Sequence, residues 1–146
     1  MIICSACLLG IECNYRGGSN LNSRVLKLLD KNILIPVCPE QLGGLPTPRE
    51  NAEIVGDGYM VLDGRGKVVT CSGKDVTQYF VKGAMETLRI VKLYGIDSAI
   101  LKQCSPSCGS GKIYDGTFSE RLVSGDGVTT ALLKRNGVKV FSEEDI

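Results

Sequence analysis

The sequence contains no histidine and no tryptophan, and the absence of histidine restricts the chemistry that it can support. Without an imidazole the chain cannot build a Ser-His-Asp or Cys-His catalytic arrangement, or a zinc site with a histidine ligand. Any acid–base chemistry must use carboxylates, lysine, tyrosine, cysteine or a group bound to a metal. The histidine-dependent hydrolases are therefore excluded.

Strong net charge and long apolar runs are also lacking. The formal net charge is +1, so no strong field draws the chain to nucleic acid or to an anionic membrane. No apolar run approaches the roughly 20 residues of a membrane span, and the first residues lack the basic start and apolar stretch of a signal peptide. We expect a cytoplasmic protein whose partners include neither nucleic acid nor a membrane.

Cysteine, in contrast, is abundant, with seven among 146 residues. An odd count without a secretion signal does not fit a secreted disulfide scaffold. In a reducing compartment, clustered cysteines more often bind metal or take part in catalysis. The length and the hydrophobic fraction of 43% indicate a single globular domain over residues 1–146.

Hydrophobic periodicity predicts strands that alternate with helices. We expect strands at 2–4, 33–38, 98–102 and 138–141, and helices at about 22–30, 75–94 and 128–135. Asn22 or Ser23, Asp75 and Asp126 are the expected N-caps of these helices. The segments 59–62 and 67–70 flank an Asp-Gly-Arg-Gly turn and predict a β-hairpin, whereas 41–58 and the Gly-rich stretch near 109–116 are expected to be loops. This order predicts an α/β fold, Rossmann-like with three layers, in which helices cover a mostly parallel sheet and a β-hairpin is inserted.

Cysteines follow three of the predicted parallel strands. The first strand leads to Cys4 and Cys7, the second to Cys38, and the strand after the long helix to Cys104 and Cys108. The carboxyl ends of parallel strands lie at one edge of a sheet, where ligands usually bind. We therefore expect thiols from all three segments to meet in one metal site. Sulfur ligation favours an iron–sulfur cluster, zinc or copper(I) over cations that prefer oxygen.

Individual cysteines also have simpler interpretations. Cys4 can pack as a small hydrophobic residue in a buried strand. Cys71, at the end of the predicted hairpin, is expected to have no role. Cys13 and Cys104 can either tune a site or do nothing.

Several segments together resemble the DUF523 family, whose characterised members are thiouracil desulfidases. The matching stretches are SACLLG at 5–10, CNYRG at 13–17, VCPE at 37–40, GGLP at 43–46, PR at 48–49, Lys102, SPSCG at 105–109, YDGTF at 114–118 and GDGVT at 125–129. The resemblance implies a [4Fe–4S] cluster held by Cys7, Cys38 and Cys108, with the fourth iron open to the sulfur of a thiolated pyrimidine base such as 2-thiouracil. It further implies a desulfuration without net redox change, in which a hydrosulfide-loaded cluster forms and the carbonyl product leaves.

Two further residues are assigned roles mainly on this resemblance. Glu40 lies two residues after Cys38, and Ser105 lies three residues before Cys108, so both are expected to face the open iron. We assign Glu40 as the general base that activates water, and Ser105 as a proton relay or substrate orienter. The alternatives are an ion pair within the loop for Glu40 and a turn-forming hydroxyl for Ser105.

Other polar and aromatic residues stay open between a function and a structural role. Arg49 and Lys102 either bind substrate or a phosphate, or form ion pairs on the surface. Tyr15 either stacks on a base or fills the core. Glu50 and Glu53 are candidates for a second carboxylate.

Two alternative functions compete with a desulfidase. The first is a non-enzymatic iron–sulfur or zinc-binding protein that senses iron or oxygen, or stores sulfur. The second is a dithiol oxidoreductase that uses Cys4-x-x-Cys7. The second is disfavoured, because a reactive dithiol needs a helix start beside it, and here a Gly-rich loop follows Cys7. The oligomeric state does not follow from the sequence.

Overall fold

In the computed structural model, which describes residues 1–146, the centre of the fold is a four-stranded sheet with the order β2-β1-β5-β8. All three pairs of neighbouring strands in it are parallel. Its strands are β1 (Ile2–Ser5), β2 (Leu34–Val37), β5 (Ser98–Leu101) and β8 (Lys139–Ser142). These bounds agree with the four predicted strands to within one or two residues.

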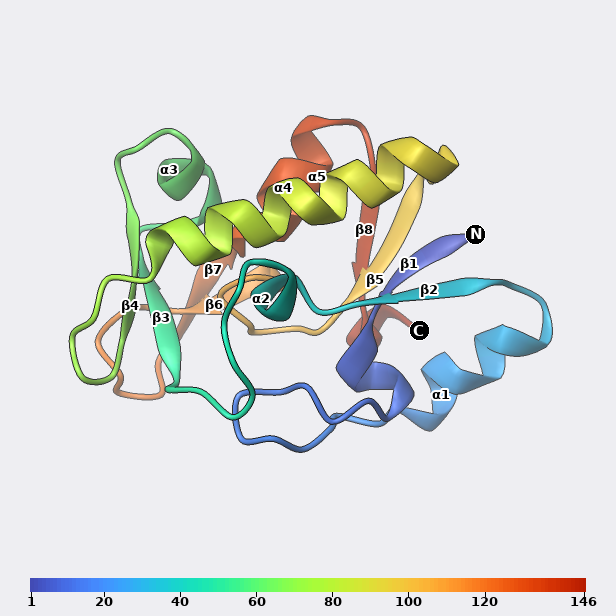
Figure 1. Ribbon diagram of the computed structural model, residues 1–146, viewed down its shortest axis with the longest axis horizontal. Coiled ribbons are helices and arrows are strands. Elements are labelled where there is room, and N and C mark those ends of the chain that lie inside the picture. The colour runs from blue at the N-terminus through green and yellow to red at the C-terminus, as the bar shows by residue number, and fades with distance from the viewer.

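Helices cover this sheet on both faces. The helices of the chain are α1 (Ser23–Leu26), α2 (Pro39–Leu42), α3 (Gly58–Leu62), α4 (Thr77–Tyr94) and α5 (Val128–Arg135), with 3-10 helices at Ala6–Leu9, Lys27–Asp30 and Glu143–Asp145. Of these, α3 packs beside the smaller sheet of β3 and β4 and not on the central one. Figure 1 shows α4 crossing the length of the molecule above the sheet, with α1 on the opposite side. None of these helices combines the length and the apolar character needed to cross a membrane.

The three layers follow from the alternation of side chains along the strands. Ile3 of β1 points to one face and packs in a cluster with Leu88 and Val91 of α4. Its neighbour Cys4 points to the other face and packs in a cluster with Val25 of α1. Because both faces bury apolar side chains, the predicted α/β fold with a mostly parallel, helix-covered sheet is confirmed.

The inserted hairpin is present, but its first strand is not the predicted one. The strand β4 (Lys67–Thr70) pairs in antiparallel fashion with β3 (Ala52–Val55), which lies inside the segment expected to be a loop. Residues 59–62 belong to α3 instead, because the carboxylate of Asp57 accepts a hydrogen bond from the N–H of Met60 and caps that helix. A cap of this kind decides between helix and strand where a short apolar run cannot.

The Gly-rich segment after β5 also contains structure that periodicity did not predict. It forms β6 (Ser110–Tyr114), which pairs in antiparallel fashion with β7 (Leu122–Asp126). Gly111 lies in β6 with φ +90°, a conformation that glycine adopts readily. Because a glycine-rich segment is typical of a loop, this strand is recognised only from its pairing with β7.

The predicted caps have different outcomes. Asn22 caps α1 as predicted, since its side chain accepts hydrogen bonds from the N–H groups of Arg24 and Val25. The prediction for Asp126 is wrong, because Gly127 occupies the N-cap of α5. The buried Asp126 carboxylate instead pairs with Lys134 at 3.0 Å and accepts hydrogen bonds from the Tyr59 hydroxyl and from the N–H of Gly111.

The N-terminus of α5 holds the loop 105–109 in place. The first N–H groups of a helix have no partner within the helix, and here those of Val128 and Thr129 donate to the carbonyls of Pro106 and Ser107, each at 2.9 Å. Gly127 makes this approach possible, because a Cβ there would lie 2.5 Å from the carbonyl carbon and oxygen of Ser107. The loop that carries Cys108 is thus fixed by the helix behind it.

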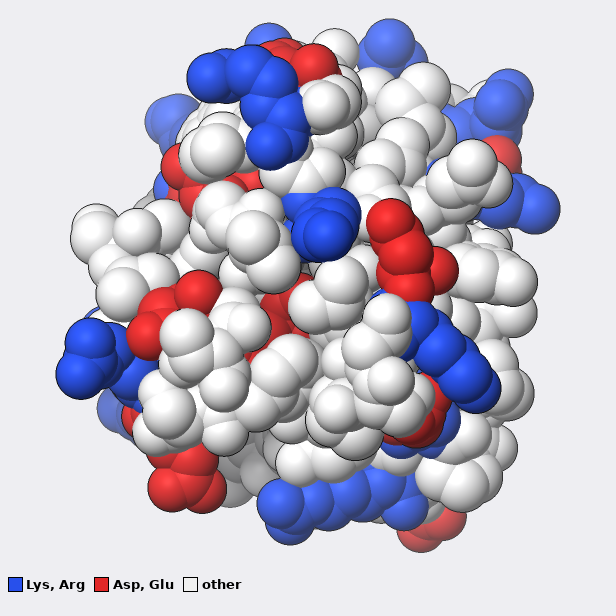
Figure 2. All heavy atoms as spheres, turned by 90° about the vertical axis from the view of Figure 1, so that its left-hand side faces the viewer, with Lys and Arg blue, Asp and Glu red and all other residues white.

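The charges on the surface are mixed in sign. Figure 2 shows lysine and arginine side chains interspersed with aspartate and glutamate on the face that it presents.

We predict that Gly127→Ala destabilises the fold by roughly 1–3 kcal/mol, because the added methyl group must displace the 105–109 backbone. Gly18→Ala is the matched control, since a Cβ there meets only Asn14 side-chain atoms at ordinary contact distances of 3.7 and 3.8 Å. Urea denaturation of both variants measures the effect. Equal unfolding midpoints for the two would contradict it.

Candidate functional site

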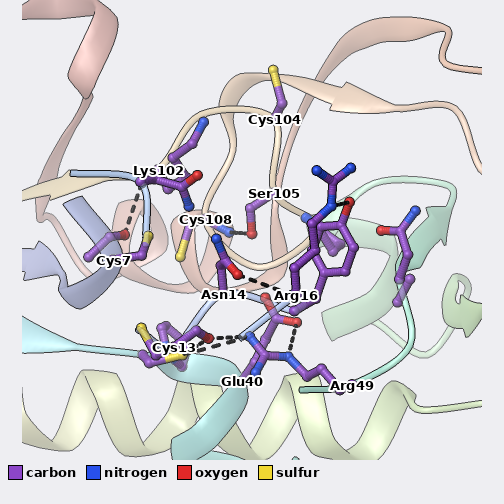
Figure 3. Close-up of a pocket in the computed structure, with 18 of the residues that line it drawn as sticks. Cys7, Cys13, Asn14, Arg16, Glu40, Arg49, Lys102, Cys104, Ser105 and Cys108 are labelled. Atoms are coloured by element: carbon purple, nitrogen blue, oxygen red, sulfur yellow. Dashed lines mark hydrogen bonds and ion pairs between the residues drawn. The ribbon is translucent and has the colours of Figure 1, made fainter. Parts of the chain in front are cut away.

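A cavity of about 550 Å³ opens at the carboxyl edge of β1, β2 and β5. Five of the seven cysteines line it, namely Cys7, Cys13, Cys38, Cys104 and Cys108. Carboxylates, cations and aromatic side chains complete its wall, among them Glu40, Arg49, Glu53, Lys102, Tyr15 and Phe118. Figure 3 shows the arrangement of the main lining residues.

Three of these cysteines reach the cavity from three different strands. Cys7 lies in the 3-10 turn that follows β1, Cys38 directly follows β2 and caps α2, and Cys108 lies in the loop after β5. In Figure 3 the sulfurs of Cys7 and Cys108 both point into the cavity. The structure thus brings into one cavity the thiols that the sequence predicted to meet.

Cys13 is the thiol whose place the sequence left open. It is 2% exposed, packs in one cluster with Cys7, and accepts a hydrogen bond from Cys38 Sγ through its carbonyl at 3.7 Å. Hydrogen bonding with the Cys13 thiol lowers the pKa of Cys7 and of Cys38, against the opposing effect of burial, and the pKa of Cys13 is raised in return. Cys7 and Cys38 are therefore readily deprotonated, which is the form in which a thiol binds metal.

Cys108 lies in a drier environment. Burial raises its pKa, although a hydrogen bond from Ser5 opposes this rise. A thiol of this kind loses its proton when a metal binds it.

The remaining cysteines have other surroundings. Cys4 is completely buried in the core and burial raises its pKa to about 12, in agreement with its interpretation as a packing residue. Cys71 is exposed and does not line the cavity. Cys104 adopts a left-handed backbone with φ +68°, and its sulfur points away from those of Cys7 and Cys108 (Figure 3). No group of three Cys, Asp or Glu side chains is placed to hold a single metal ion.

Glu40 and Arg49 form a buried pair in the cavity wall. Arg49 Nε lies 3.1 Å from Glu40 Oε1, and the side chains of Arg49 and Glu40 are 5% and 18% exposed. The ion pair that was the alternative interpretation of Glu40 and of Arg49 is thus present, but it is largely buried and not on the surface. Burial raises the pKa of Glu40 above its ordinary value, and the adjacent guanidinium limits the rise.

Arg49 also ties this pair to the cysteines. Its Nη2 donates to the carbonyl of Cys13 at 2.9 Å and lies 4.0 Å from Cys38 Sγ. Its Nη1 donates to Pro46 and Thr47. The positive charge favours the thiolate of Cys38, so Arg49 orients the carboxylate and stabilises the neighbouring sulfur.

Ser105 has the turn-forming role that was its alternative interpretation. Its Oγ accepts hydrogen bonds from the N–H groups of Ser107 and Cys108, both at 3.1 Å. Because both bonds use lone pairs of Oγ, the hydroxyl proton remains free of any acceptor in the chain. Ser105 lines the cavity, where that proton is available to a ligand.

The other candidates divide between cavity and surface. Lys102 lines the cavity and pairs with Glu143 at 2.8 Å; burial would lower its pKa, but Glu143 raises it on balance. Tyr15 is 36% exposed and lies under the Arg16 guanidinium, so the alternative that it fills the core is excluded. Glu50 pairs with Lys74 outside the cavity.

Several lining residues, among them Asn20 and Phe118, were given no individual role from the sequence. The N–H of Asn20 donates to the carbonyl of Cys7 at 2.9 Å, and Phe118 lines the cavity. Both lie in irregular segments without periodicity. The signal for Phe118 is its place in the YDGTF segment that resembles the DUF523 family, and the sequence offers none for Asn20.

Comparison with known proteins identifies the family of this chain. Residues 2–145 match the family model described as 2-thiouracil desulfurase. The chain is 50% identical over 147 residues to the Bacillus subtilis (strain 168) protein named "Uncharacterized protein YbbK", and the match covers 100% of this chain and 97% of that protein. It is also similar to the solved structure of the [4Fe-4S]-dependent thiouracil desulfidase TudS (DUF523Vcz), with a TM-score of 0.88 and 45% identity over 99% of this chain and 91% of that one. The chain belongs to the 2-thiouracil desulfurase family.

Proposed function

We propose that this protein is a [4Fe–4S]-dependent desulfidase that replaces the sulfur of a thiolated pyrimidine base, such as 2-thiouracil, by oxygen without net redox change. The observation that carries the proposal is the meeting of thiols from the ends of β1, β2 and β5 in one cavity, beside a carboxylate and a free hydroxyl. The similarity to TudS supports the cofactor and the reaction.

The residues of the cavity fit an iron–sulfur cluster. Cys7, Cys38 and Cys108 would hold it, and the lowered pKa of Cys7 and Cys38 supplies two of the thiolates. A cluster takes each thiolate at a different iron, so its ligands need not converge on one point as they would around a single ion. When bound, it supplies a Lewis-acidic iron that attracts the soft sulfur of a thiocarbonyl.

Glu40 has the properties of a general base for the attack of water on the carbon that carries the sulfur. Its raised pKa makes it a stronger proton acceptor than an ordinary carboxylate. Arg49 holds its Oε1, whereas Oε2 has no partner in the chain and can take the proton from water.

Ser105 is the second residue of the cavity that can move a proton. The backbone N–H groups of Ser107 and Cys108 fix the position of its oxygen. Its hydroxyl proton is left free to form a hydrogen bond with an acceptor on the substrate. In this role Ser105 orients the substrate and donates its proton, which is regained from the solvent.

The proposal predicts that the anaerobically reconstituted protein releases sulfide from 2-thiouracil and forms uracil in equal amount, without an added reductant or oxidant. Sulfide is measured colorimetrically and uracil by chromatography. A protein that keeps its cluster and releases no sulfide from 2-thiouracil or 4-thiouracil would instead support a non-enzymatic cluster protein.

A second prediction concerns the ligands. Cys7→Ser, Cys38→Ser and Cys108→Ser are each expected to abolish the broad absorbance near ~400 nm and the bound iron, because a hydroxyl is a poor ligand for iron in a cluster. Cys71→Ser is the control, since this thiol is exposed and outside the cavity. Full iron content in any of the three cavity variants would remove that residue from the ligand set.

A third prediction separates the base from the cluster. Glu40→Gln is expected to keep the visible spectrum and to lower kcat by roughly 10²- to 10⁴-fold, because the amide cannot take a proton. Glu50→Gln, ten residues on and outside the cavity, is the matched control and is expected to leave kcat unchanged. Normal turnover by Glu40→Gln would exclude it as the base.

A further inference from the structure

Glu53 differs from the other carboxylates of the cavity because it is buried without a cation. The other two are Glu40, which pairs with Arg49, and Glu120, which is exposed. Glu53 is only 5% exposed, lines the cavity, and forms no ion pair with any lysine or arginine. The proposed reaction has not used this group.

The two oxygens of Glu53 have different surroundings. Oε1 accepts hydrogen bonds from the N–H groups of Gly116 at 3.0 Å and Phe118 at 3.1 Å, both in the loop between β6 and β7. Oε2 accepts no hydrogen bond, and it is not sealed inside the protein, since no buried side-chain oxygen lacks a partner. One oxygen thus fixes a loop, and the other is left for the cavity.

The loop that Glu53 holds carries an aromatic side chain into the same cavity. Gly116 and Phe118 have φ values of +91° and +57°, a left-handed backbone that two hydrogen bonds to one carboxylate oxygen stabilise. Phe118 is half-buried and lines the cavity. Glu53 therefore fixes the backbone of a residue whose aromatic ring lines the same cavity as its own free oxygen.

When a ligand fills the cavity, the free Oε2 of Glu53 needs a hydrogen-bond donor. Removing a carboxylate oxygen from water without a compensating hydrogen bond is unfavourable. A ligand that displaces water from Oε2 must therefore bring an N–H or O–H group to it. Flat heterocycles with a ring N–H satisfy this requirement and also present a face to Phe118.

We propose that Glu53 is a specificity-determining residue, whose Oε2 accepts a hydrogen bond from a ring N–H of the substrate while Phe118 covers the ring. This inference rests on the proposed function and narrows its substrate class. The enzyme acts on heterocyclic thiocarbonyls that keep an unsubstituted ring N–H, and it discriminates against their N-alkylated forms.

Glu53→Gln separates the two roles of this side chain, because the amide can keep the hydrogen bonds to the loop but not the acceptor for the substrate. Its carbonyl oxygen still accepts from Gly116 and Phe118, whereas its NH₂ group presents a donor where the ring N–H needs an acceptor. We measure uracil binding to the cluster-loaded protein by calorimetry, and KM and kcat for 2-thiouracil and for its 1-methyl and 3-methyl derivatives.

We expect Glu53→Gln to weaken uracil binding and raise KM by roughly 10- to 100-fold, the size of a lost hydrogen bond to a charged group. We expect kcat and the cluster spectrum to be little changed. The native protein is expected to discriminate against at least one N-methyl derivative, and Glu53→Gln to lose that discrimination. Phe118→Ala is expected to raise KM, and Phe118→Tyr to restore it.

Uracil binding equal to that of the native protein, or the same discrimination in native protein and variant, would overturn the proposal. A fall in kcat with unchanged KM and unchanged uracil binding would also overturn it. If Glu53→Gln fails to fold, the native protein alone still tests the proposal. Equal kcat/KM of the native protein for 2-thiouracil and for both methyl derivatives would then contradict it. A native protein that binds uracil through Glu53 but releases no sulfide would refute the desulfidase and leave the recognition intact.

Discussion

The parallel pairing of β1 with both β2 and β5 is the constraint on which the site depends. It places the carboxyl ends of three strands at one edge, with Ser5 opposite Val37 and Cys4 opposite Ile100. The segments that leave these strands carry Cys7, Cys38 and Cys108, and all three therefore begin at the same edge of the sheet. A thiol site assembled from residues up to 101 positions apart in the sequence is thus a direct consequence of three short parallel strands.

Neighbouring contacts hold these segments in a fixed arrangement. The N-terminus of α5 binds the carbonyls of the loop that carries Cys108, and Gly127 allows the two backbones to touch. Arg49 connects the Glu40 carboxylate to the Cys13 carbonyl and to the sulfur of Cys38. The same contacts of Arg49 therefore position a proposed cluster ligand, Cys38, and the proposed general base, Glu40. Neither side chain can shift far without the other.

The sequence predicted the parts of the molecule that depend on local patterns. The strands, the helix 77–94 and the Asn22 cap follow from periodicity and capping, and the convergence of cysteines follows from topology. The pairing of β4 with β3, the β6–β7 hairpin and the loss of the Asp126 cap depend on contacts between segments distant in sequence. The same holds for the Cys13 thiol and for the free oxygen of Glu53, whose surroundings are set by loops without periodicity.

An anaerobic crystal structure of the reconstituted protein would show whether the three thiols hold a cluster. We expect a four-iron cluster in the cavity, bonded to the sulfurs of Cys7, Cys38 and Cys108, with one iron facing Glu40 and Ser105 and without a protein ligand. A cluster bound by a different set of cysteines, or a single metal ion in its place, would contradict it.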